Sequence, residues 1–252
     1  MSSVKQSAGW ELRTQQVLLP KSGLEPFECE DVIGIDEQNC RFAVADGATE
    51  AFDARNWAQR LAENWVRSDS ALTAETFHEW VAHEGTALHA TWKELKLPWY
   101  AEEKARKGSF AAFVGVELDL GSEAPSWKAI ALGDACLLHC RAGALIKSLP
   151  VSASASFNSA PLLVASDPGL YKTSAGSVMI DSGRCRNNDV LFLLSDAAAA
   201  WYLERFEQNN FTDVLRDNSE AADFFENERL AGRIRNDDIA VIRLEIQQRS
   251  IS

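Results

Sequence analysis

Several acidic residues stand where short apolar segments of the sequence begin or end. Asp46, Asp134 and Asp196 each follow an apolar run, whereas Glu30, Asp31 and Asp237 each precede one. Short apolar runs bounded by polar turn residues predict buried strands. One acid at a strand end is more typical of a turn or a helix cap than of a ligand, and Asp196 could cap the helix predicted after it.

The number of such acids changes their interpretation. If the strands belong to neighbouring sheets, their ends place several carboxylates in one region. Mutual repulsion would then raise the pKa values of these carboxylates, unless cations neutralise them. A ligand shell made only of oxygen atoms selects Mg²⁺ or Mn²⁺ over zinc, which prefers histidine and cysteine. The sequence therefore predicts a site for hard divalent cations.

The order of the elements predicts the class of fold. Residues 32–35 and 40–45 form a predicted hairpin, apolar spacing from residue 54 to 95 predicts two or three helices, and residues 109–120, 127–140 and 144–150 are typical of strands paired antiparallel. A strand at 189–196, helical segments at 197–208 and 212–233, and a strand at 238–246 follow, while 151–188 is expected to be irregular. Strands and helices do not alternate strictly. An α+β fold of two antiparallel sheets with helices outside is expected, as one domain spanning residues 1–252.

Composition excludes several classes of protein. The net charge of −12 and the pI near 4.8 disfavour nucleic acid and anionic membrane surfaces as partners. The five cysteines contain no C-x-x-C pair, which argues against a disulfide framework and a zinc knuckle and predicts a reducing, cytoplasmic location. No apolar run is long enough to predict secretion or a membrane span.

Six short motifs resemble those of the metal-dependent serine/threonine protein phosphatases of the type 2C class (PPM-type). In chain order they are ECED, VADG, GSFAAFVGV, LGDACLLHCRAGAL, LLSDA and NDDIAVI, and they span about residues 30 to 246. The resemblance implies a four-layer αββα sandwich with metal ions at one end. It also implies hydrolysis of phosphoserine and phosphothreonine in proteins. A compact, stand-alone domain of this kind suggests a regulatory role that opposes a kinase.

The resemblance also implies roles for individual residues. Asp46 would bridge two Mg²⁺ or Mn²⁺ ions. Glu30 and the carbonyl of Gly47 would complete one ion, and Asp196 and Asp237 would bind the other. Asp31 would hold water bound to these ions, and Asp134 would help to bind a third, weaker ion.

Two departures from the type 2C pattern concern substrate binding. No arginine stands in residues 24–28, where relatives place one for the substrate phosphate, and no histidine follows Asp46-Gly47, where relatives place a candidate general acid. Lys21 or Arg13 could replace the arginine, although ordinary surface charge is the favoured interpretation of both. Glu50 or water could protonate the leaving group. Asp238 stands where the class usually has asparagine.

Three hypotheses follow from the sequence. The leading one is a Mg²⁺/Mn²⁺-dependent phosphatase of phosphoserine and phosphothreonine in proteins. The second is a pseudophosphatase, a phosphoprotein-binding or regulatory module of the same fold. The third is a metal-dependent phosphatase of small phosphorylated molecules. The sequence defines neither the physiological substrate nor the oligomeric state.

Overall fold

The chain folds into two antiparallel sheets in a computed structural model, which describes residues 2–7, 9–68, 73–157, 161–170, 175–216 and 220–249. Sheet A contains, in spatial order, β1 (Ser2–Ser7), β2 (Trp10–Leu19), β12 (Ile239–Gln248), β11 (Asp189–Leu194), β7 (Cys136–Arg141) and β8 (Ala144–Leu149). Sheet B contains β10 (Met179–Arg184), β6 (Ser126–Leu132), β5 (Phe110–Asp119), β4 (Arg41–Gly47) and β3 (Asp31–Asp36), and the short β9 (Val164–Ala165) pairs with β5.

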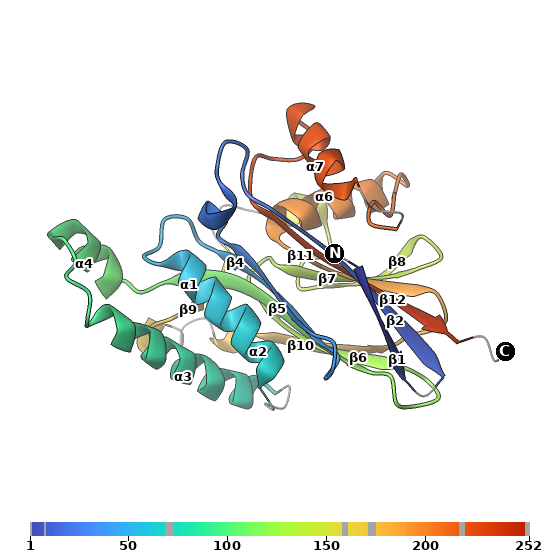
Figure 1. The fold of residues 1–252 in the computed structure, drawn as a ribbon, viewed down its shortest axis with the longest axis horizontal. Coiled ribbons are helices and arrows are strands. Elements are labelled where there is room, and N and C mark those ends of the chain that lie inside the picture. The colour runs from blue at the N-terminus through green and yellow to red at the C-terminus, as the bar shows by residue number, and fades with distance from the viewer. Residues whose placement is uncertain are drawn as a thin grey trace.

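Helices cover the outer faces of both sheets. Beside sheet B lie α1 (Ala54–Gln59), a π-helical turn η2 (Arg60–Asn64), α2 (Trp65–Arg67) and α3 (Ala74–Trp92), while α4 (Trp99–Arg106) extends away from it (Figure 1). Beside sheet A lie α6 (Asp196–Glu207) and α7 (Ala221–Leu230). Single 3-10 turns are η1 (Pro26–Glu28), η3 (Ser154–Ser156) and η4 (Ala175–Ser177).

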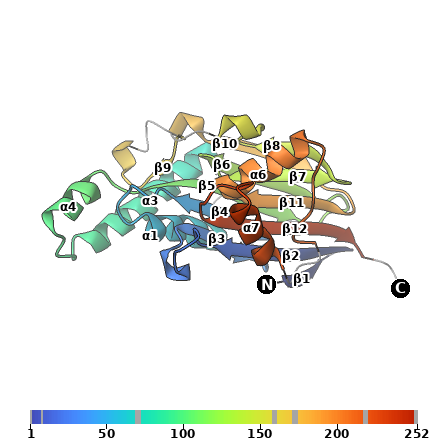
Figure 2. The ribbon, with the colours of Figure 1, turned by 90° about the horizontal axis from the view of Figure 1, so that it is seen from above.

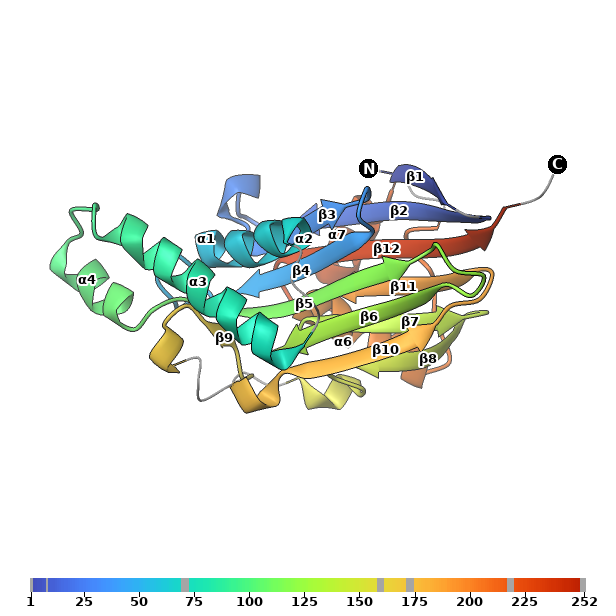
Figure 3. The ribbon, with the colours of Figure 1, turned by 90° about the horizontal axis from the view of Figure 1, so that it is seen from below.

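Three apolar cores separate the four layers. The central core joins the facing sides of the two sheets, with Val44 and Val114 from sheet B against Leu193 and Ile242 from sheet A. A second core packs α1, α2 and α3 on sheet B around Trp57, and a third packs α6 and α7 on sheet A. Alternate residues of a strand point to opposite faces, so each central strand serves two cores. The arrangement is the predicted αββα sandwich, and the layers are visible from two further directions (Figures 2 and 3).

Most predicted elements are confirmed, including the first hairpin, in which β3 pairs with β4. Three expectations were wrong. Residues 127–140 are two strands rather than one, because the chain turns at 133–135 and passes from sheet B to sheet A. Of the segment 212–233, predicted to be helical, only α7 is a helix among the described residues. Residues 217–219 lie outside the described ranges. The region 151–188, expected to be irregular, contains β9 and β10.

Strands β1, β2 and helix α4 were not anticipated at all. Polar residues alternate through β2 (Trp10–Leu19), which hides its apolar face in the sequence, although Leu12 is fully buried. Within the described residues, no helix is long and apolar enough to cross a membrane.

Candidate metal centre

Asp31 and Asp46 lie opposite each other on neighbouring strands. Asp31 is the first residue of β3 and Asp46 the penultimate residue of β4, and the antiparallel register pairs them directly. Asp31 is almost fully buried, with one carboxylate oxygen, Oδ2, that has no hydrogen-bond partner. Two carboxylates paired across a strand repel each other. A bound proton or cation would therefore stabilise this pair.

Gly47, at the end of β4, lies where no side chain fits. A Cβ atom on Gly47 would meet the backbone oxygen of Ala54 at 2.9 Å and that of Glu30 at 3.0 Å. The Gly47 amide also donates a hydrogen bond to the Glu30 carbonyl, at 3.3 Å. The glycine thus holds the backbone of Glu30 against the end of β4, next to Asp46.

Asp134 enters the same region from the turn between β6 and β7. The preceding Gly133 has a positive φ of 104°, and a Cβ there would meet the Ala112 side chain at 2.6 Å. Positive φ is accessible to glycine at little cost. The turn buries Asp134 within the electrostatic reach of Asp46.

Asp196 begins helix α6, directly after β11. Ser195, not Asp196, is the N-cap residue, so the expectation that Asp196 caps this helix was wrong. Ser195 instead ties the helix start to β12: its hydroxyl accepts a hydrogen bond from the Ala240 amide (2.9 Å), and its own amide donates to the Ala240 carbonyl (3.0 Å). These bonds fix Asp196 beside the start of β12.

Asp237 and Asp238 precede β12 and have different roles. Asp237 is partly exposed and interacts with two cationic side chains. Asp238 is buried, and its two carboxylate oxygens accept hydrogen bonds from the backbone amides of Lys21 and Glu30, each at 2.7 Å. A carboxylate offers acceptors on both oxygens, whereas an asparagine amide offers only one. This double contact explains aspartate at a position where asparagine was expected.

Two cationic side chains of the chain itself lie among the acids. The Nζ atom of Lys21 is 3.2 Å from Asp237 Oδ1 and 3.9 Å from Glu30 Oε2, and it donates a hydrogen bond to the Thr49 hydroxyl (2.8 Å). The guanidinium of Arg235 contacts Asp196 and lies 3.4 Å from Asp237. Lys21 is therefore part of the acidic site, and its interpretation as ordinary surface charge was wrong.

The crowding of the acids raises several of their pKa values. Burial, followed by repulsion from Asp134 and Asp237, raises the pKa of Asp46 to about 7, although Arg235 and a hydrogen bond from Asp31 oppose the shift. Burial and the charge of Asp46 raise the pKa of Asp31 well above its ordinary value. Burial also raises the pKa of Asp134. Without added cations, this site therefore retains protons that isolated carboxyl groups would lose.

The pKa of Lys21 is raised as well. Burial lowers it, but the attraction of Asp237, Asp238 and Glu30 outweighs burial, so that the pKa rises above its ordinary value. Lys21 thus keeps its positive charge at the centre of this acidic group.

No family model and no curated protein matches this sequence. Solved structures do match its fold. The serine/threonine phosphatase PstP/Ppp of Mycobacterium tuberculosis is 14% identical, with a TM-score of 0.62 over 94% of this chain and 99% of that one. The catalytic domain of PstP with two manganese ions gives 0.60 at 14% identity, over 94% and 99% of the two chains. A bacterial serine phosphatase gives 0.59 at 13% identity, with the same coverage.

The chain has the fold of these phosphatases. Six of these acids lie where strands of the fold begin or end, and they come from five separate places in the chain: Glu30 and Asp31 at the start of β3, Asp46 in β4, Asp134 after β6, Asp196 after β11, and Asp237 before β12. Contacts through Lys21 and Arg235 link Glu30, Asp196 and Asp237, and the charge interactions of Asp46 link Asp31 and Asp134 to them.

The residues of this phosphatase fold suit hard divalent cations. Their donors are all oxygens, the Asp31 carboxylate has an unpartnered buried atom, and the backbone around Gly47 has room only for hydrogen in place of a side chain. The candidate donors here are the carboxylates of Glu30, Asp46, Asp134, Asp196 and Asp237 and the carbonyl of Gly47.

Another group of potential ligands lies at the opposite end of β11. Side-chain atoms of His139, Cys185 and Asp189 come within 4.8 Å of one another, closer than the acids do as a set within the described residues. However, Asp189 already accepts two hydrogen bonds from the Arg141 guanidinium, at 2.7 and 2.8 Å, and one from His139 at 2.9 Å. Its charge is neutralised by these partners. This group is a structural ion-pair network.

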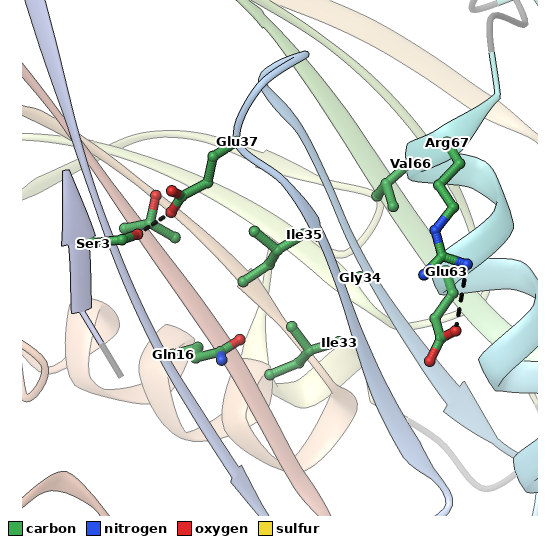
Figure 4. Close-up of a pocket in the computed structure, with 10 residues that line it drawn as sticks. Ser3, Gln16, Ile33, Gly34, Ile35, Glu37, Glu63, Val66 and Arg67 are labelled. Atoms are coloured by element: carbon green, nitrogen blue, oxygen red, sulfur yellow. Dashed lines mark hydrogen bonds and ion pairs between the residues drawn. The ribbon is translucent and has the colours of Figure 1, made fainter. Parts of the chain in front are cut away.

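The candidate centre also does not coincide with the cavity in Figure 4, which has a volume of about 490 Å³. Ile33 and Ile35 of edge strand β3 form one wall, and Glu63 and Arg67 of the helical layer form another. None of the residues that line this cavity is a predicted metal ligand.

Arg235 contacts Asp196 and Asp237 in the candidate centre, and it was not singled out from the sequence. The expected site for a basic residue was before Glu30, whereas Arg235 lies two residues before Asp237 in the segment RNDD. An arginine so close to an expected ligand was a usable signal. Glu50, by contrast, is exposed, and Arg13 pairs with Glu11 at 2.9 Å, as an ordinary surface charge would.

Proposed function

We propose that this protein is a Mg²⁺/Mn²⁺-dependent phosphatase that hydrolyses phosphoserine and phosphothreonine in proteins. The observation that carries the proposal is a set of acids from five segments that are linked by shared cationic partners and by charge interactions, including a buried carboxylate oxygen with no hydrogen-bond partner. Repulsion among such acids opposes folding. A requirement for bound cations accounts for their presence. The core shared by both sheets supports treating residues 1–252 as one domain.

In this proposal Asp46 would be shared by two ions, Glu30 and the Gly47 carbonyl would hold one, and Asp196 and Asp237 would hold the other. When bound, two such ions activate water as a nucleophile and stabilise the charge that develops on the phosphoryl oxygens. Asp134 contributes to a third, weaker site.

The remaining steps belong to side chains of the chain itself. Asp31, buried beside Asp46, is able to hold a proton and to orient a water molecule through its free Oδ2 atom. Lys21 presents a permanent positive charge at the same place and is partly exposed, so it can attract the substrate phosphate in the role of the missing arginine. Asp238 holds the backbone of both Lys21 and Glu30 in position.

One observation favours the alternative of a phosphoprotein-binding module. Lys21 and Arg235 already pair with Glu30, Asp196 and Asp237, so the acids are partly neutralised by the chain itself. A module that needs no metal ion would require such pairs.

Hydrolysis assays separate these functions. We expect Mn²⁺-dependent turnover of para-nitrophenyl phosphate and of a phosphothreonine peptide, and a loss of at least a hundredfold in Asp46→Asn and Asp237→Asn, because each removes a ligand. Asp36→Asn, at the other end of β3, is the matched control and should retain activity. Mn²⁺ binding without turnover would support the binding module, and turnover of the small ester alone would support a phosphatase of small molecules.

A further inference from the structure

Arg235 spans two of the proposed ligands of a single ion. Its Nη2 atom pairs with Asp196 Oδ2, and its Nε atom lies 3.4 Å from Asp237 Oδ2. The two acids come from different elements, the start of α6 and the segment before β12. A guanidinium carries several donors in one plane and can therefore hold two carboxylates at once.

The segment that carries Arg235 is anchored on both sides. The Asp237 amide donates to the Arg235 carbonyl (2.9 Å), and the buried Arg229 donates to the Asp237 carbonyl (2.6 Å) and to the Pro20 carbonyl (2.8 Å). Asp238 adds its two contacts to backbone amides. The backbone near Arg235 is thus held in place, and its guanidinium is kept at a high local concentration beside the two acids.

Much of the Arg235 side chain faces solvent. It is 45% exposed, whereas that of Asp196 is only 17% exposed. Rotation of the arginine about its own side-chain bonds would move the guanidinium into water, while both carboxylates would stay where their elements hold them.

We propose that Arg235 is a built-in counter-cation that competes with the divalent ion for Asp196 and Asp237. Without metal, its guanidinium neutralises the two acids and stabilises the fold. A divalent ion binds at these acids only after displacing the guanidinium, so the arginine weakens the metal affinity of this side of the centre. The inference rests on the proposed metal site and adds a control on its occupancy.

Calorimetric titration with MnCl₂ tests this competition without an activity measurement. Arg235→Gln should bind Mn²⁺ about tenfold more tightly than the unaltered protein, which corresponds to about 1.4 kcal/mol. Its melting temperature without metal should be lower, and its increase on adding Mn²⁺ should be larger.

Arg233→Gln is the matched control. Arg233 lies in the same segment, but it pairs with Glu228 rather than with the proposed ligands (2.6 Å). Its Mn²⁺ affinity should be unchanged, even if its melting temperature falls. If Arg235→Gln does not fold without metal, Arg235→Lys is the second test variant. Lysine keeps the charge but lacks the planar fork, so its Mn²⁺ affinity should be higher than that of the unaltered protein.

The outcomes separate the two proposals. Equal or weaker Mn²⁺ binding by both Arg235 variants, with clear binding by the unaltered protein, would overturn the competition and leave the metal site standing. Absence of Mn²⁺ binding in all of these proteins would overturn both. Tighter Mn²⁺ binding by the Arg235 variants but not by Arg233→Gln supports the competition, and loss of Mn²⁺ binding in Asp237→Asn would place the ion at these acids.

Discussion

Replacing Asp46 with asparagine should stabilise the metal-free protein while destroying its metal site. Asp46 is surrounded by acids, and burial and the charges of Asp134 and Asp237 raise its pKa from 3.8 to about 7. The folded protein therefore binds a proton at Asp46 more tightly than the unfolded chain does. Asparagine has nearly the same shape and carries no charge, so it removes the cost of ionisation.

The sign and size of the effect follow from proton linkage. Below about pH 4 the carboxyl group is protonated in both states, so its raised pKa does not affect the free energy of unfolding. Between about pH 4 and 7 the raised pKa lowers this free energy progressively, and above about pH 7 the reduction is complete. One pKa unit corresponds to about 1.4 kcal/mol, so the cost approaches roughly 1.5 kcal/mol at pH 5 and about 4 kcal/mol at pH 8. These figures are upper bounds, since Asp31 competes for the same proton.

Urea denaturation in EDTA at pH 5 and pH 8 measures this effect. Asp46→Asn should exceed the unaltered protein in unfolding free energy at both values, with the larger gain at pH 8. Asp36→Asn provides the contrast. Although burial opposes the shift, hydrogen bonds from Asn39 lower the pKa of Asp36, so that variant should lose stability at pH 8. If Asp46→Asn does not raise the free energy of unfolding, or raises it equally at pH 5 and pH 8, then repulsion among these acids does not destabilise the folded protein.

Three further substitutions test other parts of the centre. Asp238→Asn should lower the free energy of unfolding by about 1–3 kcal/mol in urea titrations, because one of two backbone amides loses its acceptor; unchanged stability would exclude this anchoring role. Gly47→Ala should weaken Mn²⁺ binding in calorimetry, since its Cβ would press on the Glu30 carbonyl at 3.0 Å; an unaltered affinity would count against this geometry. Asp189→Asn should cost about 3–5 kcal/mol, measured by urea unfolding, because it leaves Arg141 partly buried without its partner. The Mn²⁺ affinity of that variant should not change, and a change would indicate that the ion binds at the other end of β11.

The sequence predicted the sandwich because its central strands are strongly apolar. In β4 and β11 nearly every residue is buried, so the apolar runs and the polar turns beside them mark the strands directly. Strand β2 was missed because its polar residues obscure the pattern. The passage between sheets at residues 133–135 was missed for another reason. Both halves of that segment are apolar, and the turn between them is marked only by Gly133, which has a positive φ, and Asp134.

The acids of the candidate centre were proposed from their positions at strand ends, whereas the contacts that Lys21 makes with these acids could not be predicted. Lys21 precedes Glu30 by nine residues in the sequence and reaches it through a loop. Its place depends on the contact between its backbone amide and Asp238, which lies more than two hundred residues away. Such contacts between distant segments are set by tertiary packing, and no local pattern reveals them.

The two cationic side chains determine how the chain can fold before any ion arrives. Carboxylates as crowded as Asp31 and Asp46 destabilise a fold unless protons or cations compensate them. Protons remain on Asp46 only up to about pH 7. Above that pH, Lys21 and Arg235 are the positive side chains in contact with the proposed ligands. Since Lys21 also contacts Asp237, removal of either cation should make the folded state depend more strongly on bound metal. In the unaltered protein, folding would come first, and displacement of the arginine and capture of the ion would follow.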